Sequence, residues 1–141
     1  MQNWGFFCKI GKIWGNLFWQ NRKGFIMRKK NYKGRCTKTT ASKSKTVCRT
    51  YDDIAFNYLK VLETNEFITE IKCNVPINLS ELGEYTTDFV CVKNDGDLLV
   101  RECVYRRLIS RPSTIKLLDA SREHWLKRGV TDWGIVINEK E

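Results

Sequence analysis

The stretch LLVRECVYRR, residues 98–107, decides the fold of this chain. Its apolar and β-branched residues predict a buried strand, although the run contains an acid at Glu102 and ends in two arginines. The preceding apolar run, TTDFVCV, holds a second acid, Asp88, and the turn residues NDG at 94–96 separate the two runs. This pattern predicts a β-hairpin over 86–105 with one carboxylate in each strand.

A helix and a strand are expected before this hairpin. The helix begins at a capping-box-like Thr50-x-x-Asp53, continues through apolar residues at helical spacing and ends at Asn65. The following run FITEIKCNVPI, residues 67–77, alternates as a strand does, with Pro76 at its far end.

A second helix and a last strand are expected after the hairpin. Pro112 breaks the chain, and an amphipathic helix runs from Ser113 until Gly129 caps it. The apolar run TDWGIVIN, residues 131–138, predicts the final strand. The resulting order, α-β-β-β-α-β, predicts an α/β domain built on one central mixed sheet.

The positive charge is concentrated in the first third of the chain. Residues 1–50 carry thirteen Lys or Arg and no acid, whereas residues 51–141 carry twelve against sixteen Asp or Glu. Residues 27–49 are polar and basic without periodicity, which predicts a flexible arm ahead of an ordered domain at 50–141. Such an arm either binds nucleic acid through phosphates or remains a solvated tail without a partner. The DNA-binding candidates are Arg28, Lys29, Lys30, Lys33, Arg35, Lys38, Lys43 and Lys45.

Residues 1–26 form an aromatic-rich extension with a weak amphipathic pattern, which also suits a helix on a membrane surface. No apolar run approaches the roughly 20 residues of a membrane span. Arg22-Lys23-Gly24 can be encoded by a purine run like a bacterial ribosome-binding site, and Met27 follows closely. We therefore hypothesise that Met27 is the native start and that residues 1–26 are a translated leader.

The six cysteines form no CxxC motif, and with the single histidine they make no standard zinc spacing. Cys91 and Cys103 lie inside strand-like runs, which argues against a disulfide framework. We interpret the cysteines as reduced core thiols of a cytosolic protein. Trp125 and Trp133 are interpreted as core residues that pack a helix on a strand.

Asp88 and Glu102 can face each other across the ladder of the predicted hairpin. Two like charges at such a short distance repel each other, which is unfavourable unless a divalent cation lies between them. Oxygen ligands without histidine or thiolate suit Mg²⁺ or Mn²⁺, and such a site activates water and stabilises charge on a phosphate. Alternatively, both carboxylates hydrogen-bond to neighbours or pair with the nearby Arg101 and Arg106. The spacing alone leaves both interpretations open.

Two segments, EYTTDFVCVKNDGDLLVRECV and RPSTIKLLDASREHWLKRGVTDWGIVI, follow an early helix that carries an acid. Together they resemble the PD-(D/E)XK nuclease fold and, more specifically, the TnsA family, the endonuclease subunit of heteromeric transposases. The resemblance covers residues 50–141 and corresponds to the family's N-terminal catalytic domain. It implies a restriction-endonuclease-like core in which Asp88 is a metal ligand and Glu102 the second acid. The family's first-helix glutamate falls at Asp53, or alternatively at Asp52.

The resemblance also implies an activity. A TnsA-like subunit is a Mg²⁺- or Mn²⁺-dependent endonuclease that cleaves transposon ends at the strand its partner transposase does not cut. The implied partners are transposon-end DNA, the transposase subunit and an ATPase regulator, with no membrane involved. The implied location is the bacterial cytoplasm, in association with the nucleoid.

One position departs from the family pattern. The family's core strand carries a lysine that falls here at Val104, and valine cannot offset charge on the attacking water or the phosphate. Arg106, two residues further on the same strand face, or Lys116 in the following helix could supply a cation instead. Arg106 is permanently charged, so it stabilises charge but does not readily act as a base. Without either cation, the chain is a catalytically inactive nuclease-like subunit that binds DNA or assists assembly. The sequence leaves both functions open, together with a third in which the chain is an unrelated binding protein with a basic arm.

Overall fold

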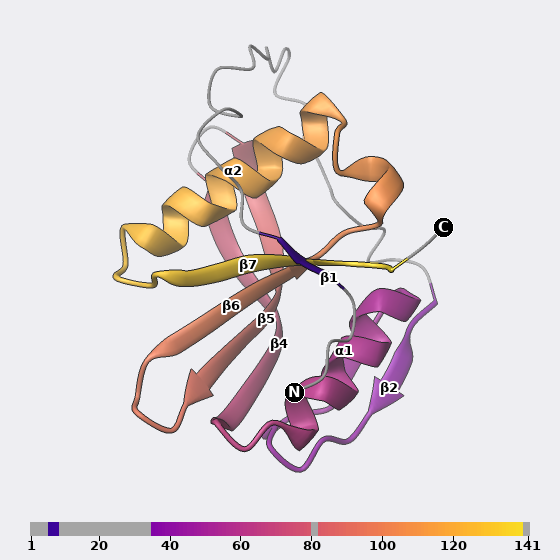
Figure 1. Cartoon of the computed structure of the whole chain (residues 1–141), viewed down its shortest axis with the longest axis vertical. Coiled ribbons are helices and arrows are strands. Elements are labelled where there is room, and N and C mark those ends of the chain that lie inside the picture. Colours follow the sequence, from indigo (N-terminus) through magenta and orange to yellow (C-terminus); the bar gives the residue numbers. More distant parts are fainter. Residues whose placement is uncertain (1–5, 9–34, 80–81, 140–141) are drawn as a thin grey trace.

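The computed structural model describes residues 6–8, 35–79 and 82–139 (Figure 1). They form a mixed α/β fold whose main elements follow one another in the predicted order α-β-β-β-α-β. The helices are α1 (Asp53–Thr64) and α2 (Pro112–Leu126), and the main sheet contains β4 (Ile68–Leu79), β5 (Gly83–Lys93), β6 (Leu98–Cys103) and β7 (Asp132–Ile137).

The main sheet is mixed, as predicted. Strands β4, β5 and β6 form antiparallel pairs, whereas β7 runs parallel to β6. Parallel neighbours require a crossover connection, and α2 provides it between β6 and β7. A short strand, β1 (Phe6–Cys8), extends the sheet along the other side of β7 in an antiparallel pair, so the strand order is β1-β7-β6-β5-β4.

Each face of the sheet carries a hydrophobic core, and α1 and α2 lie on opposite sides of the sheet (Figure 1). Consecutive residues of β7 alternate between the two cores, because neighbouring side chains of a strand point to opposite faces. The core under α1 includes Ile54, Leu59, Leu62, Ile71, Phe89, Cys91, Leu99 and Val136. The core under α2 includes Val90, Val100, Val104, Leu118, Trp125, Trp133, Ile135 and Ile137.

The alternation of side chains along β4 between the two cores is interrupted at Asn74. Cys73 packs in the core under α1, whereas Val75 packs under α2, although strict alternation would place both on one face. Asn74 has a positive φ of 55°, a conformation that asparagine tolerates better than most residues. In the register of β4 and β5, Asn74 stands opposite Asp88, between the Cys73–Phe89 and Val75–Thr87 pairs. The backbone irregularity therefore lies beside one of the two predicted acids.

Several predicted boundaries are wrong by a few residues. The N-cap of α1 is Asp52, whose carboxylate accepts from the Ala55 N–H at 2.8 Å, rather than Thr50. Strand β4 continues past Pro76, which an edge strand tolerates more readily than an inner one. Pro112 does not break the chain but is the first residue of α2, where its missing N–H has no intrahelical partner to lose.

The predicted strand at 98–107 also ends early. Strand β6 stops at Cys103, and the two arginines belong to a short 3-10 helix, Arg106–Leu108. The predicted helix end at Asn65 and the turn at 94–96 are confirmed; Gly96 has the positive φ that such a turn needs.

Residues 35–49 are not a flexible arm. They contain an antiparallel pair, β2 (Thr37–Thr39) and β3 (Cys48–Thr50), and the connecting loop is bound to the domain. Lys43 Nζ donates to the Asn65 carbonyl at 2.6 Å, and the Lys43 carbonyl accepts from the Ile71 N–H at 3.0 Å. The folded region therefore begins before Thr50. Contacts with the rest of the domain hold the β2–β3 pair in place, and a sequence without hydrophobic periodicity gives no sign of them. Of the predicted arm, residues 27–34 lie outside the described residues.

The predicted leader at 1–26 lies outside the described residues except for 6–8, which form β1 rather than a helix. The Met27 start stays a prediction. Within the part of the chain that the structure describes, no helix is long and apolar enough to cross a membrane.

Candidate functional site

The two acids of the hairpin lie next to each other on neighbouring strands, as the hairpin pattern predicts. Phe89 of β5 pairs with Arg101 of β6, so the next step along the ladder places Asp88 opposite Glu102. The Asp88 backbone N–H donates to Glu102 Oε1 at 3.4 Å. Asp88 is 2% exposed and Glu102 is 0% exposed. Two buried carboxylates in one place are costly unless neighbouring groups compensate their charge or polarity.

Hydroxyl groups from β5 and α2 surround the Glu102 carboxylate. Ser121 of α2 donates to Oε2 at 2.7 Å, and the Tyr85 hydroxyl donates to Oε1 at 3.1 Å. The Ser121 oxygen in turn accepts from the indole N–H of Trp133 at 3.2 Å. The carboxylate is thus oriented by a chain of donors that joins three elements, which satisfies a group that could not otherwise be buried.

Asp88 is held by the backbone of the neighbouring strand. Its Oδ2 accepts from the Cys103 N–H at 2.8 Å, one residue beyond Glu102. The regular backbone pairing of β5 with β6 ends at Phe89 and Arg101. Beyond that pair, the Asp88 carboxylate takes the place of a backbone acceptor and links the two strands. This bond fixes the position of Asp88 relative to Glu102.

The donor set suits a hard divalent cation. Two carboxylates and the neutral hydroxyl oxygens of Ser121 and Tyr85 are oxygen ligands, which Mg²⁺ and Mn²⁺ prefer. Among the described residues, no group of three or more His, Cys, Asp or Glu side chains is close enough to hold a metal ion. A cation at this position would therefore rest on the acid pair, with water or phosphate oxygens completing its shell.

The other predicted acid lies elsewhere. Asp53 is exposed in the first turn of α1, on the opposite side of the sheet from the Ser121 side of Glu102. It does lie near the end of β6: burial raises the pKa of the Tyr105 hydroxyl, and the charges of Asp52 and Asp53 raise this pKa further.

Val104 and Arg106 do not share a strand face. Val104 itself is 3% exposed and packs in the core under α2. The prediction that Arg106 lies on the same strand face is wrong, because β6 ends at Cys103. The Arg106 guanidinium instead donates to the backbone carbonyls of Asn138 and Glu139, at 3.2 and 2.9 Å. Arg106 thereby fastens the segment that follows β7.

Lys116 lies on α2 beside a groove of about 310 Å³ between that helix and the end of β4. Asp88 and Glu102 are not among the described residues that line the groove. The lining includes Asn78, Leu82, Asp119, His124, Lys127 and Arg128.

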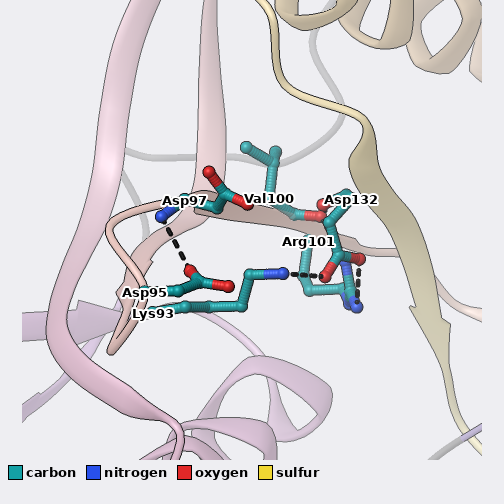
Figure 2. Close-up of polar contacts among 6 residues, drawn as sticks. All are labelled: Lys93, Asp95, Asp97, Val100, Arg101 and Asp132. Carbon is teal, nitrogen blue, oxygen red and sulfur yellow. Dashed lines mark hydrogen bonds and ion pairs between the residues drawn. The ribbon is translucent and has the colours of Figure 1, made fainter.

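A second polar cluster lies at the turn end of the hairpin (Figure 2). Arg101, only 8% exposed, binds Asp132 Oδ1 at 2.9 Å, and Lys93 binds Asp132 Oδ2 at 3.2 Å. Burial raises the pKa of Asp132, but the two cations outweigh this effect and hold its pKa below the usual value. Arg101 also donates to the Val100 carbonyl at 2.9 Å. Its predicted pairing with the acid pair stays a prediction. This cluster joins β5, β6 and β7.

Sequence reasoning missed Tyr85 and Ser121. The available signal was a serine on an otherwise apolar face of α2, where a buried hydroxyl needs a partner. The prediction that Trp125 and Trp133 are core residues is confirmed, since both are buried. Each also donates an indole hydrogen bond, Trp125 to the Thr87 hydroxyl at 3.2 Å and Trp133 to Ser121.

The basic strand pair contacts the edge strand β4 at Asn74. The Asn74 amide donates to the Arg49 carbonyl of β3 at 2.6 Å, and Asn74 is opposite Asp88. Neighbouring strands lie about 4.8 Å apart, so Asn74 and Glu102 are separated by roughly 10 Å across the sheet. On the outer face of β2 and β3, Lys38 and Arg49 are exposed and directly opposite each other.

No protein-family model matches the chain, and no curated protein matches it either. A proposal for the function therefore rests on the acid pair, on its surroundings and on the sequence resemblance.

Proposed function

We propose that this chain is the DNA endonuclease subunit of a heteromeric transposase and cleaves phosphodiester bonds at transposon ends with Mg²⁺ or Mn²⁺. The observation that carries the proposal is the placement of Asp88 and Glu102 side by side on adjacent strands, both buried. Buried like-charged pairs are costly and are concentrated at functional sites. The α-β-β-β-α-β order with β7 parallel to β6 supports a restriction-endonuclease-like core.

In this proposal, Asp88 and Glu102 hold the metal ion. When bound, the ion lowers the pKa of a water and stabilises negative charge on the phosphate. Ser121 and Tyr85 orient the Glu102 carboxylate, and Trp133 orients Ser121. The Cys103 N–H holds Asp88 in register. Because Glu102 is fully buried, the hydroxyl contacts must yield on one side before water reaches it.

The strand pair β2–β3 is the proposed contact for the DNA backbone. Lys38 and Arg49 repel each other across the pair, and a phosphate between them would relieve this repulsion. Arg35 is exposed just before β2. Lys43 and Lys45 contribute less, since Lys43 binds the Asn65 carbonyl and Lys45 pairs with Glu70 at 3.9 Å. Arg28, Lys29, Lys30 and Lys33 lie outside the described residues.

The direct test is single-turnover nicking of labelled transposon-end DNA with Mg²⁺ or Mn²⁺ and the partner transposase. Asp88→Asn should abolish nicking, because an amide is a poor ligand for the cation. Glu84→Gln is the matched control, since it removes an exposed carboxylate from the same strand and should leave the rate unchanged. Wild-type rates in Asp88→Asn would refute the catalytic assignment.

A second function is favoured by one observation, the apolar burial of Val104 together with the complete burial of Glu102. A nuclease-like subunit in this state would bind DNA or assist assembly without cutting. Wild-type protein that binds transposon ends with a strong salt dependence, yet never nicks them with either metal, would establish this alternative.

A further inference from the structure

Two cysteines from different elements meet where the basic strand pair contacts the edge of the main sheet. Cys48 begins β3 and Cys73 lies in β4, and the Cys73 thiol donates to the Cys48 sulfur at 2.6 Å. Cys48 is buried, whereas Cys73 is partly accessible. Two sulfurs at this separation can be joined with little movement of the backbone, which is the condition for a disulfide between elements.

The contact also determines which of the two sulfurs carries the shared proton. The hydrogen bond from Cys73 is the largest influence on Cys48 and outweighs burial, so the pKa of Cys48 falls to about 6. The same hydrogen bond, together with burial, raises the pKa of Cys73, so the shared proton rests on Cys73 until it is transferred to Cys48. Thiolate, rather than thiol, is the form that attacks disulfides. Cys91 gives the contrast in the same core: burial raises the pKa of its thiol to about 12, which leaves it protonated and unreactive at neutral pH.

We propose that Cys48 and Cys73 are a redox modification site at which a low-molecular-weight disulfide, such as oxidised glutathione, closes a reversible bond between β3 and β4. Transfer of the shared proton from Cys73 to Cys48 generates a thiolate on the accessible Cys73, which attacks one sulfur of the small disulfide and expels a thiolate. Cys48 then releases its proton to water and attacks the Cys73 sulfur, expelling the second thiolate. The two protein thiols are oxidised, and the small disulfide is reduced to two thiols.

Closure has a structural consequence that does not depend on the proposed nuclease activity. In the reduced chain, hydrogen bonds such as Asn74 to the Arg49 carbonyl hold β3 on the sheet edge. A covalent bond beside this contact prevents β3 from separating from β4 during local opening. Amide hydrogen exchange in β2 and β3 should therefore become slower in the oxidised chain, while exchange in α2 stays unchanged.

The test uses the full chain, first fully reduced and then equilibrated with oxidised glutathione. Wild type should lose Cys48 and Cys73 as free thiols, and peptide mapping should recover one cross-linked pair containing both. Cys73→Ser should show no modification at the buried Cys48, whereas Cys48→Ser should accumulate a glutathione adduct at Cys73. Cys36→Ser is the matched control at a partly exposed cysteine outside the pair and should cross-link as wild type does.

Dithiothreitol should restore both thiols and the faster exchange. A wild-type chain that carries only a glutathione adduct at Cys73, or that links Cys73 to another cysteine, would overturn the proposal. So would an unmodified pair under conditions where Cys36 has reacted.

Discussion

Ser121 is the residue through which the environment of Glu102 can be tested most directly. Ser121→Ala removes the 2.7 Å donor to a fully buried carboxylate and the acceptor of the Trp133 indole. A lost hydrogen bond to a charged group destabilises by about 1.5–3 kcal/mol, and a stranded buried N–H adds about 1–3 kcal/mol. Alanine recovers roughly 0.5 kcal/mol through its higher helix propensity. Together these terms give an expected net loss of unfolding free energy of about 2–5.5 kcal/mol.

The assay is reversible urea denaturation followed by tryptophan fluorescence and circular dichroism. Ser113→Ala is the matched control, because it makes the same change on an exposed position of the same helix. The control isolates helix propensity, so it should be neutral or slightly stabilising. If the unfolding free energies of Ser121→Ala and Ser113→Ala differ by less than about 0.5 kcal/mol, then water replaces the Ser121 hydroxyl, and the claim that Glu102 is buried from water is refuted.

Three further predictions concern other positions. Val104→Lys should destabilise the fold by several kcal/mol because it buries a cation in the core under α2, and a melting temperature equal to wild type would show that Val104 is not enclosed. Lys38→Glu combined with Arg49→Glu should lower the slope of log affinity for DNA against log salt by about 0.9 for each phosphate that the protein no longer neutralises. If the strand pair binds the DNA, the control Lys127→Glu on α2 should leave this slope unchanged. Asp132 has a folded-state pKa below its unfolded value of 3.8, so its stabilisation is present above that pH and is lost as pH falls through the folded pKa. Asp132→Asn should therefore be less stable at neutral pH and lose less stability on acidification; an acid-unfolding profile as steep as wild type would contradict this.

The sequence predicts those parts of the fold that depend on local patterns. Helical spacing in α1 and α2, alternation in β4 and the turn at Gly96 each determine an element within a short window. The adjacency of Asp88 and Glu102 follows from the same logic, since a two-stranded hairpin with a short turn fixes which residues face each other.

What could not be predicted depends on contacts between distant residues. Strands β2 and β3 have three residues each and no periodicity, and their position is set by contacts such as Cys48 with Cys73. Arg101 forms its ion pair with Asp132, which lies thirty-one residues away in the chain. The face change at Asn74 left no pattern in the sequence, because asparagine can also adopt the ordinary extended backbone of a strand.

The pairing of β1 with β7 bears on how the chain behaves at high concentration. Strand β7 is apolar, and its outer backbone groups would form an open sheet edge without Phe6, Phe7 and Cys8 opposite Ile137, Val136 and Ile135. Open apolar edges recruit strands from other molecules and lead to aggregation. A chain without residues 6–8 would lose this cover, so we expect it to self-associate with rising concentration while the full chain stays dispersed.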